Sequence, residues 1–185
     1  EDIPVIASHG AVNGMHSISQ WHTTDYPERA ELFNNIDINF YDDELIRIAR
    51  SHGLFGIQLD ERRIGSKKAI KESKIYVPNK RKQLRKKSLL VWRQIEHVAE
   101  VLDAEGLFCW GIQSIGSDFD GMVHPIKGLW TAENIKDLGA ELFKHASAYM
   151  NKNRTNFNHF NRLTPESIVE RVLHHNAMEF IKRYY

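Results

Sequence analysis

The stretch "IQSIGSDFDGMVHP", residues 112–125, joins a short run of apolar and small residues to an abruptly polar end. Successive side chains of a strand point to opposite faces, so one face here carries Ser114, Gly116 and Asp118, while Ile115 lies on the other. The pattern predicts a strand with a small, polar face and an apolar face suited to packing against helices. The strand ends in a carboxylate.

Two more runs have strand character, and segments with helical spacing separate all three. Asp42 is expected to cap the helix that follows it, and a longer helix is expected over residues 84–105. Further helices are expected from Thr131 and from Thr164. Strands that alternate with helices at this spacing predict parallel βαβ units. The three predicted strands are residues 4–8, 54–60 and 111–117.

Composition restricts the class of protein. The chain has 185 residues, 42% of them hydrophobic, and a net charge of +1, so nothing in its overall charge predicts a nucleic-acid partner. Its one cysteine, Cys109, allows no intrachain disulfide, and we expect a buried thiol. The sequence has neither a membrane span nor a signal peptide, so we expect a soluble protein of undecided compartment. The apolar run near Glu1 suggests that a segment upstream has been removed.

Two segments interrupt the alternation of strands and helices within what we expect to be one domain, residues 1–185. Residues 62–87 form a basic insertion with twelve lysines and arginines against one acid, and residues 149–162 form an asparagine-rich polar loop. The basic insertion would bind an anionic partner or the acidic surface of a neighbouring subunit, or it is a solvated surface. We favour the solvated surface, because runs of charge are usually exposed to water.

Polar residues lie at the carboxyl ends of the predicted strands. His9 ends "PVIASHG", Gln58 and Asp60 end the second strand, and Asp118 follows the third. The loops after parallel strands converge at one rim, so we expect these side chains to lie near one another. An imidazole and a carboxylate in this arrangement predict a zinc-type site, in which metal-bound water is the nucleophile.

At these same residues the sequence resembles the membrane (renal) dipeptidase family of metal-dependent amidohydrolases. The resemblance rests on "GSDFDG" (116–121) followed by "GL", on "PVIASHG" (4–10), on "INFYDDELIRIARSHGLFGIQL" (38–59) and on "ESIVERVLHHNAMEFIKRYY" (166–185). It implies that the chain is the C-terminal portion of a (β/α)8 TIM barrel, about strands six to eight with their helices.

The resemblance also implies roles for individual residues. His9 matches a zinc ligand of a centre that holds two ions in the intact enzyme. Asp118 matches a carboxylate beside the metals that takes the proton of the attacking water and then protonates the leaving amine. Asp120 is expected to accept amides of its own loop. The implied activity is zinc-dependent hydrolysis of a dipeptide or small amide bond.

The sequence departs from the family in two ways. The other metal ligands of the family, including an H-x-D pair, do not occur, so the chain alone should be inactive. Ile38 stands where the family has an arginine that binds the substrate carboxylate. Arg29, or Arg62 and Arg63, are candidates to replace it, with Gln58 and Asp60 as further substrate contacts.

Partners follow from this incompleteness. We expect the missing N-terminal half of the barrel or another subunit, and homo-oligomers, because three strands leave open edges. The alternatives are a non-catalytic binding or assembly module and a plain three-strand βαβ domain.

Overall fold

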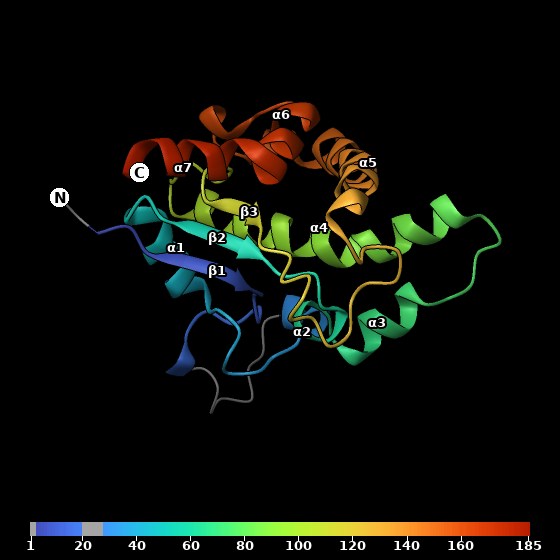
Figure 1. Cartoon of the computed structure of the whole chain (residues 1–185). Helices are drawn as coiled ribbons and strands as arrows, with labels where there is room; N and C mark the ends of the chain where they lie inside the picture. The colour runs from blue at the N-terminus through green and yellow to red at the C-terminus, as the bar shows by residue number, and fades with distance from the viewer. Residues whose placement is uncertain (1–2, 20–27) are drawn as a thin grey trace.

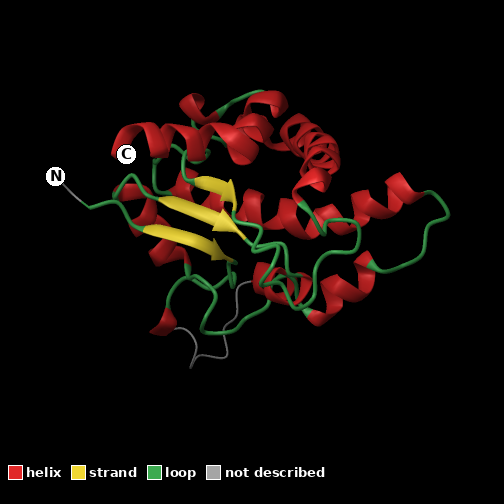
Figure 2. Cartoon of the chain, in the orientation of Figure 1, coloured by secondary structure: helices red, strands yellow, loops and turns green. Residues whose placement is uncertain are grey.

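A computed structural model describes residues 3–19 and 28–185. Its sheet has three parallel strands in the order β1 (Ile6–Gly10), β2 (Leu54–Ile57) and β3 (Gln113–Ile115), as Figure 2 shows. All three lie within the predicted runs or extend one of them by two residues, so the prediction of three parallel strands is confirmed.

Helices lie behind this sheet and beyond its β3 edge (Figure 1). The long helix α4 runs behind the strands, and α5, α6 and α7 lie together beyond β3, while α3 packs against the first part of α4. Short 3-10 turns occur at Glu28–Leu32, Ala132–Asn134, Arg154–Asn156 and His159–Asn161, and a π-helical turn at Arg171–His175 joins α6 to α7. The helices are α1 (Asp42–Arg50), α2 (Glu61–Ile64), α3 (Lys67–Ser73), α4 (Lys80–Ala104), α5 (Ile135–Asn153), α6 (Pro165–Glu170) and α7 (Asn176–Tyr184).

The prediction that the chain is a portion of a TIM barrel is wrong. Helices make up 57% of the structure, and the sheet found in the described residues has only three strands, so the chain is a small α/β domain. In a barrel, every strand pairs with a neighbour on both edges, whereas β1 and β3 are edge strands here. Buried side chains of the strands, α1, α4, α5 and α6 form one continuous core, so the helices of this chain cover its own short sheet.

The small residues on one face of the predicted strands have a local explanation. The pairing of β1 with β2 shifts between Ala7 and Gly10, so β1 bulges at Ser8 and His9. A Cβ placed on Gly116 would lie 2.0 Å from the Ser8 carbonyl oxygen. Glycine is required at that position because the bulge brings the backbone of β1 over the sheet.

The two segments that interrupt the strand–helix alternation are largely helical. The basic segment 62–87 runs through the end of α2, α3 and the first two turns of α4, and α4 begins at Lys80 because the Asn79 side chain accepts a hydrogen bond from the Lys82 amide. The polar segment 149–162 contains the end of α5 and two 3-10 turns. No helix in residues 3–19 and 28–185 combines the length and the apolar character needed to cross a membrane.

Glu141 on α5 is a buried carboxylate that joins α5 to α4. It accepts hydrogen bonds from Arg85 Nε, at 2.8 Å, and from Lys144. Burial by itself would raise the pKa of Glu141, but these two cations outweigh burial and hold the pKa below its ordinary value of 4.5. Because the pKa is lower in the folded state, the stability that the ionised form contributes is present above about pH 4.5 and is lost as pH falls through the folded-state value.

Replacing Glu141 with glutamine should therefore lower the free energy of unfolding by about 2 kcal/mol at pH 7, because two charge-assisted hydrogen bonds are weakened. The difference from the wild type should shrink below pH 4.5. Urea unfolding at pH 7 and at low pH measures both effects. An equal difference at both pH values would contradict this account of the pair.

Candidate functional site

A cavity of about 600 Å³ lies at the carboxyl ends of β1 and β2, next to the loop that follows β3. Its apolar wall includes Phe40, and Ile38 lies at its rim with an exposed side chain. The structure thus brings together all but one of the site residues predicted from the strand ends. The polar residues in its wall are His9, Gln58, Asp60, Arg62, Arg63 and His124.

Asp118 does not line this cavity but contacts its wall. Its Oδ2 accepts a hydrogen bond of 2.8 Å from Gln58 Nε2, and Gln58 is only 7% exposed. Asp118 has φ +57°, in the left-handed region that non-glycine residues rarely adopt. A Cβ on Gly121 would lie 2.2 Å from Asp118 Oδ1, so the glycine of "DFDG" makes room for this carboxylate. The side chain is therefore held in one position by both neighbours.

Asp60 has a structural task. One oxygen accepts hydrogen bonds from the amides of Arg62 and Arg63 and so caps α2. The other accepts from the amides of Val123, at 3.1 Å, and His124, at 2.7 Å. Asp60 thus ties the loop after β3 to the turn after β2, and both of its oxygens are occupied by backbone donors.

The loop contact expected of Asp120 is made instead by Asp60. The side chain of Asp120 is exposed and forms no hydrogen bond with residues of the described segments. The two acids of "DFDG" therefore differ in role: Asp118 contacts the cavity wall, and Asp120 faces solvent.

Two buried polar atoms in the cavity wall lack a hydrogen-bond partner among the described residues. They are Gln58 Oε1 and Arg63 Nε. Buried polar atoms are nearly always paired, so these two are available to a ligand or to water. The exposed His9 ring also lines the cavity, with its Nδ1 3.0 Å from the Ser8 hydroxyl.

The residues present do not complete a zinc site. No group of three histidine, cysteine, aspartate or glutamate side chains within residues 3–19 and 28–185 is placed to hold a metal ion. Zinc takes at least three protein ligands, so His9 and Asp118 would supply only part of its coordination.

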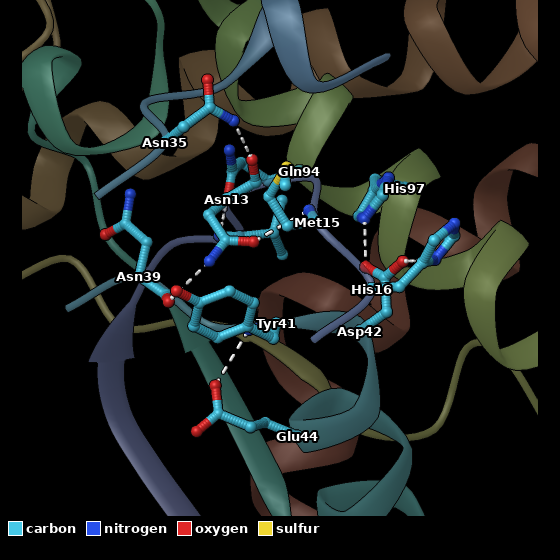
Figure 3. Close-up of polar contacts among 11 residues, drawn as sticks. Asn13, Met15, His16, Asn35, Asn39, Tyr41, Asp42, Glu44, Gln94 and His97 are labelled. Carbon is cyan, nitrogen blue, oxygen red and sulfur yellow. Dashed lines mark hydrogen bonds and ion pairs between the residues drawn. The ribbon is translucent and has the colours of Figure 1, made fainter. Parts of the chain in front are cut away.

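A polar network that the sequence did not reveal joins the loop after β1 to α1 and α4 (Figure 3). The carboxylate of Asp42, in the first turn of α1, forms two hydrogen bonds with histidine rings. One is with Nε2 of His97 on α4, at 2.7 Å, and the other is with Nδ1 of His16 in the loop after β1, at 2.8 Å. Asp42 is not the helix cap that its position predicted. The cap is Tyr41, whose amide donates to Glu44. No sequence spacing connects the three members of this cluster.

Asparagines of the segment between β1 and α1 hold the backbone of the two cavity arginines in place. Asn39 Nδ2 donates to the carbonyl oxygen of Arg63 at 2.9 Å, and Asn34 Nδ2 donates to that of Arg62 at 2.7 Å. Asn13, fully buried, donates to the carbonyl oxygen of Asn39. The loop after β1 therefore sets the position of the turn after β2.

Comparisons with known proteins add no family to this description. The chain matches no protein-family model, and searches of curated proteins and of solved structures find no significant relative. The resemblance to the dipeptidase family therefore stays a prediction from sequence motifs.

Proposed function

We propose that the protein acts in the hydrolysis of a small peptide or amide bond, with Asp118 as the residue that handles the proton. The position of Asp118 carries this proposal: its backbone is in a rare conformation, and Gln58 orients its carboxylate beside a cavity whose wall includes two arginines. Unusual backbone conformations of polar residues cluster at functional sites, where the surrounding structure maintains them.

The proposed chemistry uses the carboxylate twice. Asp118 Oδ1 accepts a proton from water while the water oxygen forms a bond to the carbonyl carbon of the substrate. The carbon–nitrogen bond then breaks, and Asp118 returns the proton to the leaving amine. The amide of Gln58 holds Oδ2 in place. Arg62 and Arg63 offer positive charge to a substrate carboxylate.

Zinc, with two ions in the intact enzyme, remains part of the proposal only as an incomplete site. His9 and Asp118 would be its ligands in this chain, and the other ligands would come from a further segment or another subunit. The proposed association with a second copy or another subunit has a candidate location, because β1 is an edge strand and Val5 and Ile6 beside that edge are exposed.

Replacing Asp118 with asparagine should lower turnover at least about 100-fold, because general acid–base catalysis contributes that much or more. Hydrolysis of a panel of dipeptides, with and without added zinc, measures the effect. Asp120→Asn is the matched control, since it removes an exposed charge from the same turn, and it should leave turnover unchanged. Inactivity of the wild-type protein when it is assayed together with the segment or subunit that completes its zinc site, or Asp118→Asn as active as the control in that assay, would refute the proposal.

The second candidate is a non-catalytic binding module. A second cavity, whose wall includes the buried residue Lys87, favours this candidate, and Asp118 does not line that cavity. Anion binding without any hydrolysis would support this candidate.

A further inference from the structure

A second and larger cavity lies between the α3–α4 hairpin and the loop before α5. It measures about 1010 Å³, and no described residue lines both it and the cavity around Gln58. Figure 1 shows the hairpin projecting away from the sheet, with the loop after β3 running beside it. Four lysines lie in its wall, Lys74, Lys80, Lys87 and Lys127.

Lys87 is the unusual member of this set. Lys87 as a whole is only 6% exposed, and its ammonium group has no hydrogen-bond or ion-pair partner in the described parts of the chain. A buried lysine is normally paired, because removing its charge from water is costly. Burial lowers the pKa of Lys87, and the nearby Lys127 lowers it further. The stem of Lys87 is thus buried, while its unpaired ammonium group lies at the cavity wall, where an anion could reach it.

The surrounding carboxylates offset this charge only in part: Glu61 raises the pKa of Lys87, but burial and Lys127 outweigh it. Glu61 also lines the cavity, but it is already bonded to Lys74. Asp137 lies in the wall at an exposed position and forms no ion pair with Lys87. The first turn of α4 adds Lys80 and its basic neighbours to the positive end of the helix dipole, where anions are normally favoured.

We propose that this cavity binds a small phosphorylated molecule that carries an aromatic ring, with its phosphate against Lys87 and Lys127. Lysines act as point charges and suit phosphate, whereas carboxylates are more often held by the forked group of arginine, which is missing from the residues that line this cavity. Tyr76 and Trp130 line the same cavity and are 79% and 56% exposed, so they offer aromatic faces for stacking. This proposal does not depend on hydrolysis at Asp118.

Calorimetric titration with adenosine monophosphate, inorganic phosphate and adenosine tests the proposal. The monophosphate should bind most tightly, inorganic phosphate more weakly, and adenosine not measurably. Lys87→Met keeps the apolar stem and removes the charge, and it should weaken binding of the monophosphate at least about tenfold, the value of one charge-assisted hydrogen bond.

Lys86→Met is the matched control, because it removes the same charge from the next residue of α4, whose side chain lines a different cavity. The affinity of the Lys86→Met variant for adenosine monophosphate should stay within about twofold of wild type. Lys127→Met gives a second reading if the Lys87 variant does not fold. No binding of either phosphate compound to wild type, or equal affinities of the variants, would overturn the site. Equal affinities for inorganic phosphate and the monophosphate would overturn the role of the aromatic residues.

Discussion

Replacing Asn161 with alanine should lower the free energy of unfolding by about 3 kcal/mol or more. Asn161 is fully buried in the 3-10 turn before α6. Its Oδ1 accepts from the Cys109 amide at 3.1 Å, and its Nδ2 donates to the Leu107 carbonyl at 2.9 Å and to Asp103. Alanine would leave backbone groups of the chain before β3 without partners, and each unpaired buried group costs about 1–3 kcal/mol.

Urea unfolding measures this loss, and the thiol of Cys109 provides a local reading of it. Burial, reinforced by the carboxylate of Asp103, raises the pKa of Cys109, so the native thiol should react slowly with a thiol reagent. Asn161→Ala should speed that reaction markedly. Asn156→Ala, at an exposed asparagine of the same segment, should change neither reading. Equal stabilities of the two variants would show that the hydrogen bonds of Asn161 are dispensable.

Replacing Asp42 with alanine should also lower the free energy of unfolding by about 3 kcal/mol. The side chain of His97 is 7% exposed and would lose the acceptor of its Nε2, and the loop after β1 would lose its bond through His16. That loop holds the turn of Arg62 and Arg63 through Asn34 and Asn39. The cavity around Gln58 should therefore lose order together with overall stability.

Asp43→Ala is a matched control for this second variant. Asp43 also lies in the first turn of α1, so both changes remove the same favourable interaction with the helix dipole. The Asp43 side chain, however, is 44% exposed, and its contact with Arg47 is long, at 4.0 Å. We expect a loss below about 1 kcal/mol for Asp43→Ala. Urea unfolding curves of the two variants measure the difference, and similar midpoints would contradict the importance of the Asp42 cluster.

Local patterns predicted the strands and much of the site. Alternation of side chains located β2 and β3, and polar residues at the strand ends indicated His9, Gln58 and Asp60, which the structure places around one cavity. Arg62 and Arg63, suggested by the family resemblance, line the same cavity. Cys109 is buried, as its lack of a nearby base suggested. These features depend on neighbours in sequence, and such neighbours are visible in a single chain.

Other residues have partners that are far away in sequence. Asp42 and His97 are separated by 55 residues, and Asp60 meets the amide of His124 across 64. Lys87 lies within a run of charges that is otherwise typical of a solvated surface, and only the packing of α3 and the loop before α5 around α4 buries it. No periodicity marks such residues, so sequence reasoning assigned several of them ordinary roles.

The sequence by itself determined where the three strands lie, that they run parallel, and that acidic, basic and imidazole groups gather at their carboxyl ends, because these features follow from alternation and chain order. Only the tertiary structure decided that the sheet stays open and packs against the helices of this chain, and that the β1 bulge accounts for Gly116. It also decided that Asp60 is occupied by backbone amides, while Asp118 bonds to Gln58 in the cavity wall. These outcomes depend on how distant segments pack, since closure of a sheet and pairing of a buried charge are set by contacts in space and leave no local pattern.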